Sequence, residues 1–266
     1  LYVTQEINPF LIESEISNFV RTIAQGVHES DKEIRIFMPR FGVINERRHQ
    51  LHEVIRLSGM NLIINDYDHP LIIKVASLPG ARLQVYFLDN DDFFKRKSVF
   101  EDAKGKPFDD NADRSVFFCK GVLETVKKFG WAPDIIHCHG WMTSLVPLYL
   151  KTAYKNEPIF QNSKTVYSLY DNSLEKTFGD DFFDKASINN LEPEDLDAYK
   201  SGKSINLHAG AITFSDAVIT GSENLSKETI NLIEETDKPV LEYKGEEEYL
   251  AAYLEFFNSL LEQEVE

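Results

Sequence analysis

The chain has 266 residues, of which 42% are hydrophobic and 27% charged, a composition typical of a globular protein and outside that of disordered chains. Its formal net charge of −16 would repel nucleic-acid phosphates and anionic lipids, so we expect no nucleic acid and no membrane among its partners. Cys119 and Cys138 form no disulfide framework, and no apolar run approaches the ~20 residues of a membrane span. We therefore expect a cytoplasmic protein, and because Leu1 lies in a predicted strand we expect an initiator Met before it.

Short apolar runs alternate with helical patterns, which predicts an α/β fold with a Rossmann-like, doubly wound, mainly parallel sheet. Predicted strands cover residues 1–5, 34–38, 71–76, 83–88, 134–137, 165–169 and 217–220. Helical spacing marks residues 16–27, 118–126 and 141–149, and Pro147 must kink the third helix or lie in its first turns. We further predict an antiparallel hairpin within residues 61–76 and short helices within residues 179–203.

Most of the acidity lies in the C-terminal segment. Residues 221–266 carry 13 acidic and three basic side chains, and apolar residues recur at helical spacing between Leu250 and Leu261. This pattern predicts an amphipathic helix whose apolar stripe packs back on the domain, with a partner-binding tail as the alternative. The predicted division is a Rossmann-like domain of residues 1–222 and an acidic helical segment of residues 223–266 packed on the same domain.

The loop after the first strand is the first candidate site, because ligands of open α/β sheets bind beyond the carboxyl ends of the strands. It ends in Ile12, Glu13, Ser14, Glu15 and Ile16. The loop contains neither glycine nor lysine, and its two carboxylates would repel a phosphate at the N-terminus of the following helix. We therefore expect Ser14 or Glu13 to cap a helix that starts near Ile16.

A second candidate loop follows the strand at residues 134–137. His137 and His139 have the side-chain type of metal ligands, but on an extended strand they share a face and no further ligand is near in sequence. We expect neither a metal nor a cofactor here. His139, at the strand end, is positioned to bond a polar ligand, whereas His137 is expected to be a core histidine and His208, within a helical pattern, a structural one.

The third candidate loop follows residues 165–169 and begins with Tyr170, Asp171 and Asn172. An aromatic ring beside a carboxylate and an amide suits a sugar, which stacks on rings and hydrogen-bonds to planar polar groups. An ordinary Asp-Asn turn explains the same residues. Because the sequence contains no Gly-x-Ser-x-Gly and no Gly-x-Gly-x-x-Gly motif, the residues alone indicate an α/β ligand-binding domain.

Longer segments of the chain resemble a known family. Residues 131–151, W-A-P-D-I-I-H-C-H-G-W-M-T-S-L-V-P-L-Y-L-K, are similar to the P-D-I-I-H-x-H-D-W-H-T-A-L-V-P-x-Y-L signature of bacterial glycogen synthases and plant starch synthases. Residues 36–42 (I-F-M-P-R-F-G), 85–90 (V-Y-F-L-D-N) and 110–114 (D-N-A-D-R) are collinear with the same family. The resemblance implies the N-terminal half of a GT-B glycosyltransferase, which moves glucose from ADP-glucose to the non-reducing end of an α-1,4-glucan.

The donor side departs from what this resemblance implies. Residues 12–16 stand where the family has K-T-G-G-L, so Ile12 replaces the lysine and Ser14 and Glu15 replace the glycines. The resemblance also implies a C-terminal domain that holds most of the nucleotide, and we expect the acid-rich residues 223–266 not to supply it. Since each lost donor to a developing negative charge costs about 3–4 kcal/mol of transition-state stabilisation, we expect a pseudoenzyme with little or no independent transfer. The alternative function is a non-catalytic glucan-binding or regulatory module that acts with a partner enzyme or complementary chain.

On the acceptor side the resemblance implies an α-1,4-glucan or maltooligosaccharide ligand. His139 keeps the position whose imidazole contacts the transferred glucose and is the candidate catalytic residue, whereas Gly140 replaces an aspartate and Met142 a histidine. Tyr170 and Asp171 replace the family's H-N pair. An unrelated Rossmann-type ligand binder is the remaining alternative. The expected substrate-binding residues are Trp141, Tyr170, Asp171 and Asn172.

Overall fold

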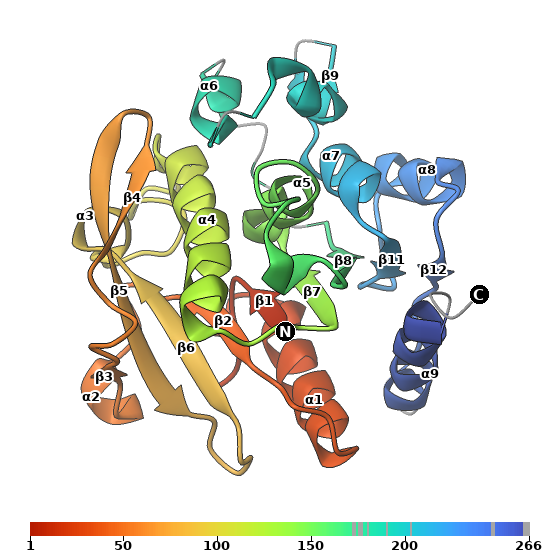
Figure 1. Ribbon diagram of the computed structural model, residues 1–266, viewed down its shortest axis with the longest axis horizontal. Coiled ribbons are helices and arrows are strands. Elements are labelled where there is room, and N and C mark those ends of the chain that lie inside the picture. The colour runs from red at the N-terminus through yellow and green to blue at the C-terminus, as the bar shows by residue number, and fades with distance from the viewer. Residues whose placement is uncertain are drawn as a thin grey trace.

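The computed structural model describes residues 1–171, 174, 178–179, 181–189, 191–202, 204–245 and 248–262. Within these residues one sheet has the strand order β12-β11-β8-β7-β1-β2-β6-β5-β3, with β4 beside β5 (Figure 1). Its strands are β1 (Tyr2–Thr4), β2 (Ile36–Pro39), β3 (His52–Glu53), β4 (Met60–Ile64), β5 (Tyr67–Ser77), β6 (Gln84–Asp89), β7 (Ile135–His139), β8 (Lys164–Leu169), β11 (Ala217–Thr220) and β12 (Val240–Leu241). A separate antiparallel pair comprises β9 (Lys200–Ser201) and β10 (Ser204–Ile205).

The sheet is mainly parallel, as the sequence predicts. The strands from β12 to β6 run parallel, whereas β3, β4 and β5 are antiparallel to their neighbours. The predicted hairpin is confirmed, because β4 and β5 pair antiparallel with Ile64 opposite Tyr67. Between them Asn65 and Asp66 both have positive φ, the backbone conformation that tight two-residue hairpin turns prefer.

The helices lie in two groups around the sheet. In one, α4 contacts α5 and α5 contacts α7, while in the other α1 contacts α9; Figure 1 shows α5 and α7 in the upper half of the view and α1 and α9 in the lower half. The α-helices are α1 (Glu15–Glu29), α2 (Glu46–His49), α3 (Asp91–Phe94), α4 (Asn111–Phe129), α5 (Leu145–Lys151), α6 (Phe182–Ala186), α7 (Leu207–Phe214), α8 (Lys227–Glu235) and α9 (Tyr249–Glu262). The 3₁₀-helices are η1 (Trp141–Thr143), η2 (Pro158–Phe160) and η4 (Pro193–Tyr199).

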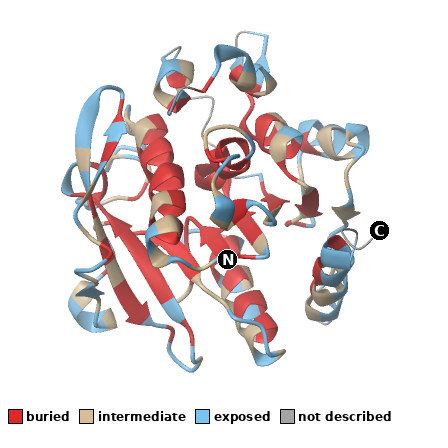
Figure 2. Cartoon of the chain, viewed as in Figure 1, coloured by how far each residue is buried: buried red, intermediate tan, exposed pale blue. Residues whose placement is uncertain are grey.

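The core follows the central strands and the inner helix faces (Figure 2). Every residue of β1 and β2 is buried, as expected for parallel strands covered on both faces. In α1 the buried positions recur at helical spacing, at Ile16, Val20, Ile23 and Val27. Pro147 is the third residue of α5, so it lies in the first turn, where its missing N–H removes no helical hydrogen bond.

The structure contains the predicted N-cap of α1 and the predicted C-terminal helix. Ser14 is the N-cap of α1, and its side chain accepts a hydrogen bond from the backbone N–H of Ile16. Helix α9 buries Tyr253, Phe257 and Leu260 and packs along α1; the division of the chain near residue 222 stays a prediction. No helix within the described ranges is long and apolar enough to cross a membrane.

Candidate functional site

The three candidate loops lie together at the carboxyl ends of the parallel strands. Strands β1, β7 and β8 are neighbours, with Thr4 paired to His139 and His139 paired to Ser168. Because these residues lie at or near the carboxyl ends of parallel strands, the loops that follow them leave the sheet side by side. The sequence-based choice of these loops therefore describes one region of the molecule rather than three.

In the first loop, the Glu6 carboxylate accepts hydrogen bonds from backbone N–H groups that precede α1. Its Oε2 atom accepts hydrogen bonds from the N–H groups of Glu13 and Ser14, at 2.6 and 2.9 Å. Its Oε1 atom accepts one from the Ser14 hydroxyl at 2.5 Å. Glu6 is almost fully buried. An internal carboxylate thus fills the kind of N–H cluster that binds anions at helix N-termini.

A cleft of about 450 Å³ opens beside this carboxylate. Glu6, Glu13 and Glu101 line the cleft, and Lys97 is the one cationic side chain among its described lining residues. Partial burial, together with the charges of Glu6 and Glu101, raises the pKa of Glu13. Ile12 is 57% exposed. The cleft therefore has an acidic character that opposes the binding of a diphosphate.

In the second loop, His139 is fully buried. Its Nδ1 atom and the Tyr170 hydroxyl lie 3.0 Å apart and share a hydrogen bond, while its Nε2 atom has no hydrogen-bond partner among the described residues. Burial lowers the pKa of His139 to about 3, so the ring is neutral near pH 7. His137 bonds the Ser168 hydroxyl at 2.7 Å and lies with its ring centroid 3.8 Å from that of His139.

Gly140 and Trp141 continue this loop in positions set by the core. Gly140 has a φ of +85°, and a Cβ atom there would overlap the side-chain oxygen of Gln5. The backbone conformation and the neighbouring Gln5 side chain therefore favour glycine at this position. Trp141 has no exposed surface and lies between the rings of Phe100 and Phe178, at centroid distances of 5.0 and 5.7 Å.

In the third loop, the predicted sugar-binding residues Tyr170 and Asp171 lie in different surroundings. Tyr170 is buried against His139, whereas Asp171 is exposed and its Oδ1 atom accepts a hydrogen bond from the Thr229 hydroxyl of α8 at 2.9 Å. Asn172 lies outside the described residues. The structure thus brings His139 and Tyr170 together, and it joins Asp171 to a helix that the sequence did not single out. Their roles in binding or catalysis stay predictions.

His208 is a structural residue, as predicted from its helical pattern. In α7 its Nδ1 atom lies 3.1 Å from the Tyr167 hydroxyl. Its Nε2 atom lies 2.9 Å from the backbone oxygen of Tyr170. Since the carbonyl oxygen can only accept, Nε2 carries the proton and Nδ1 accepts from the tyrosine. This histidine therefore fixes the end of β8 rather than facing the cleft.

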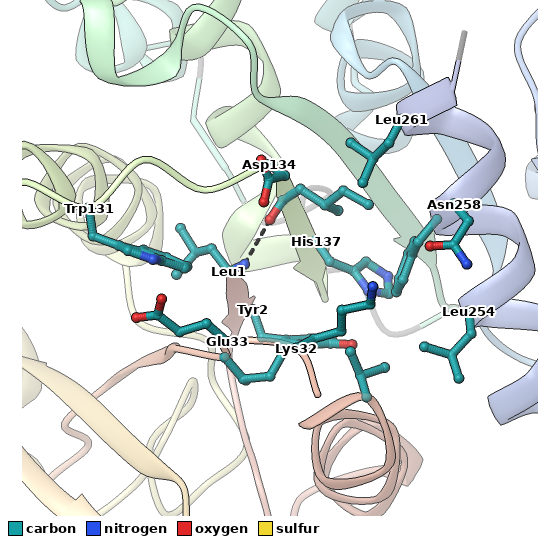
Figure 3. A pocket seen from close by; sticks show the side chains of 14 residues that line it. Leu1, Tyr2, Lys32, Glu33, Trp131, Asp134, His137, Leu254, Asn258 and Leu261 are labelled. Atoms are coloured by element: carbon teal, nitrogen blue, oxygen red, sulfur yellow. Dashed lines mark hydrogen bonds between the residues drawn. The ribbon is translucent and has the colours of Figure 1, made fainter. Parts of the chain in front are cut away.

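Aromatic side chains of α1 and α9 cover His137 and His139. This cover was not predicted from the sequence. The ring of Phe19 lies 6.2 Å from that of His139 and within 5.5 Å of the rings of Tyr249 and Tyr253. The sequence pattern that could have indicated it is the i, i+4 spacing of aromatic residues in α9. Figure 3 shows the other end of this interface, where His137 and the α9 residues Leu254, Asn258 and Leu261 line an apolar pocket of about 150 Å³ at the amino ends of β1 and β7.

Comparison with known proteins places this geometry in context. Residues 1–238 match the family model described as starch synthase catalytic domain. The chain is 37% identical over 230 residues to a glycogen synthase of Chlorobaculum parvum, covering 86% of the chain and 46% of that protein. It is 36% identical over 263 residues to a glycogen synthase of Chlorobaculum tepidum, covering 98% and 52%. The chain therefore spans about half the length of the curated relatives it matches.

A solved structure supports the fold independently. The catalytic domain of starch synthase IV from Arabidopsis thaliana, bound to ADP and acarbose, matches with a TM-score of 0.67 and 19% sequence identity. The match covers 82% of this chain and 43% of that chain. At this identity the likeness establishes the Rossmann-like fold of a GT-B glycosyltransferase domain.

Proposed function

Since this chain belongs to the family of starch synthase catalytic domains, we propose that it binds α-1,4-glucan and that its own first loop does not hold the phosphates of ADP-glucose. The first part follows its glycogen synthase relatives, which share more than a third of its residues over the matched region. The second part rests on the geometry of the loop between β1 and α1. The result is a glucan-binding glycosyltransferase-type domain without independent transfer activity.

The observation that carries this proposal is the position of the Glu6 carboxylate. It accepts three hydrogen bonds from the segment where the family's K-T-G-G-L loop aligns, two of them from the N–H groups of Glu13 and Ser14. A diphosphate that used the same N–H groups would have to displace Glu6 and then lie beside it. At about 4 Å two unit charges repel by about 4 kcal/mol in a partly buried environment. The side chain of Ile12 supplies no compensating charge.

The region around Asp171 is better suited to bind a glucan than the first loop is to bind a phosphate. Asp171 is exposed and carries a carboxylate that can accept hydrogen bonds from sugar hydroxyls. It follows Tyr170, which is hydrogen-bonded to His139. We place the glucan near these three residues. His139 then acts by holding Tyr170, because its own ring has no exposed surface.

Transfer and binding assays on the purified chain test the proposal. We expect no transfer of labelled glucose from ADP-glucose or UDP-glucose to glycogen, no heat on titration with ADP, and measurable binding of maltotriose. The Chlorobaculum tepidum glycogen synthase serves as the positive control of the transfer assay. Turnover above the buffer blank, or saturable ADP binding, would overturn the claim about the donor loop, and absence of maltotriose binding would overturn the claim about glucan.

Site variants separate the two claims. Asp171→Ala should weaken maltotriose binding, whereas Thr229→Val removes only the hydroxyl that bonds Asp171 and should leave binding within about twofold. Equal affinity of the wild type and both Asp171→Ala and His139→Ala would reject this placement of the glucan. For the donor side, the triple variant Ile12→Lys, Ser14→Gly and Glu15→Gly should still fail to bind ADP while Glu6 is present.

A further inference from the structure

A pocket of about 220 Å³ lies between α1 and the segment that leads into α9. Its lining includes three aromatic side chains and several polar ones, at the edge of the sheet where β11 ends. We propose that this pocket binds one pyranose ring of the glucan, as a subsite separate from Asp171. The proposal rests on the proposed function, because it takes the ligand to be a glucan. The residues that carry it are Glu15, Asn18, Phe19, Tyr243, Lys244 and Tyr249.

The aromatic residues provide stacking surfaces. The rings of Phe19 and Tyr249 lie 5.2 Å apart with an angle of 58° between their planes, so they form two walls rather than a flat stack. Tyr243 is 39% exposed and lines the same pocket. The C–H face of a pyranose packs against such rings, and a tyrosine adds a hydroxyl at the ring edge.

The polar residues supply both kinds of hydrogen-bond partner that sugar hydroxyls need. Glu15 is exposed and offers a carboxylate that only accepts. The side-chain oxygen of Asn18 accepts from Asn8 at 2.6 Å, which leaves its amide N–H groups for a ligand. Lys244 makes no ion pair within the described part of the chain and provides an ammonium donor. An acceptor and two kinds of donor thus surround the aromatic walls.

Size and charge select the ligand class. The volume lies below the ~300–1,000 Å³ of pockets for drug-sized ligands, so it suits a single ring and not a nucleotide. Glu15 and Lys244 give the lining one charge of each sign, so its electrostatics do not select an anion. A neutral polyol with one apolar face satisfies the lining. The terminal residue of an oligosaccharide has this chemistry.

The pocket is linked to the candidate site through one ring. Phe19 lines the pocket and lies 6.2 Å from His139 between ring centroids. Tyr243, Lys244 and Tyr249, however, follow residue 238, where the match to the family model ends. The match with the glycogen synthase of Chlorobaculum tepidum covers 263 residues and so continues through these positions.

Titration calorimetry of the full chain with glucose, maltotriose and glycogen tests the subsite. Tyr243→Ala should weaken maltotriose binding about threefold to tenfold, the loss expected for one aromatic contact, and Lys244→Ala should act in the same direction. Tyr243→Phe keeps the ring and should bind within about twofold of the wild type. Tyr67→Ala, which removes a 69% exposed tyrosine from the β5 hairpin, is the matched control and should change nothing.

The outcomes separate this inference from the proposed function. Loss on Tyr243→Ala and Lys244→Ala, with Tyr67→Ala unaffected, supports the pocket. Unchanged maltotriose affinity in both variants, while Asp171→Ala weakens binding, overturns the pocket and leaves the proposed function standing. If the wild type binds none of the three sugars, both the pocket and the proposed function fail. The melting temperature of each variant shows whether a loss of binding reflects loss of the fold.

Discussion

Glu6 and Ser14 are joined by two hydrogen bonds, one from the Ser14 backbone N–H at 2.9 Å and one from its hydroxyl at 2.5 Å. The same hydroxyl accepts from the N–H of Ile16. A carboxylate at the end of β1 is thus linked to the first turn of α1 through the N-cap. This link holds the first turn of α1 against the segment that follows β1.

Removing the Glu6 carboxylate should destabilise the protein. Glu6→Ala leaves the N–H groups of Glu13 and Ser14 without their partner, and we expect the free energy of unfolding to fall by about 1–3 kcal/mol. Glu6→Gln keeps one acceptor oxygen and should lose less. Glu13→Gln, at an exposed position of the same loop, should stay within about 0.5 kcal/mol of the wild type. Urea denaturation checks this, and equal stability of Glu6→Ala and wild type would contradict it.

The backbone at Gly140 should reject every side chain. Gly140→Ala places a Cβ atom against Gln5 at a φ of +85° and a ψ of 158°, a region essentially confined to glycine, and should cost about 1–3 kcal/mol for the backbone alone. Gly130→Ala is the matched control, because Gly130 has a φ of +70° and an added Cβ atom there would meet no atom within 4 Å. It should cost about 1–2 kcal/mol. Thermal denaturation that ranks Gly130→Ala as the more damaging change would contradict the overlap with Gln5.

Much of the fold could be predicted because it depends on local pattern. The apolar runs at residues 134–137, 165–169 and 217–220 lie within or coincide with β7, β8 and β11 apart from one residue at the start of the first. Helix α8 and strand β12 were not predicted, since one is short and polar and the other has two residues. Helix α8 is held by Asp171, which accepts a hydrogen bond from Thr229, and β12 is held by parallel pairing with β11. Contacts between segments so far apart in the chain have no local sequence signature.

The candidate site could be predicted only in outline. The rule that ligands lie beyond strand ends identified the three loops, and adjacency of β1, β7 and β8 brings them together. The burial of His139 could not be read from its loop, because Phe19 comes from α1 and Tyr253 from α9, far along the chain. Likewise the two hydrogen bonds that Ser14 donates to Glu6 depend on the path of the loop, which spacing alone does not determine.

The aromatic face of α9 should hold that helix on the domain. Phe257 is buried, with its ring 5.5 Å from that of His137. Phe257→Ala should therefore lower the free energy of unfolding by about 3–5 kcal/mol, the usual cost of emptying a buried aromatic site. Leu261→Ala, at a position 36% exposed on the same helix, should cost much less. A Phe257→Ala protein as stable as the wild type would show that α9 is detached in solution.

The buried histidines should make the protein lose stability in mild acid. Burial lowers the pKa of His139 in the fold to about 3, from 6.5 in the exposed chain, and burial also lowers the pKa of His137. Below pH 6.5 the unfolded chain therefore binds protons that the folded protein does not. Above pH 6.5 the two neutral rings cost the folded protein no stability. Below pH 6.5 the free energy of unfolding falls, for each histidine, by about 1.4 kcal/mol per pH unit until the pH reaches the folded pKa.

Urea denaturation between pH 7 and pH 5 measures this loss, in a range where most carboxyl groups stay ionised. His139→Gln removes one of the rings, so its stability should depend on pH less steeply than that of the wild type, by about one proton. His52→Gln, at an exposed residue of β3, is the control and should keep the wild-type slope. If His139→Gln and wild type show the same slope, the imidazole of His139 is protonated or exposed in the folded protein, and the burial seen here does not persist in solution.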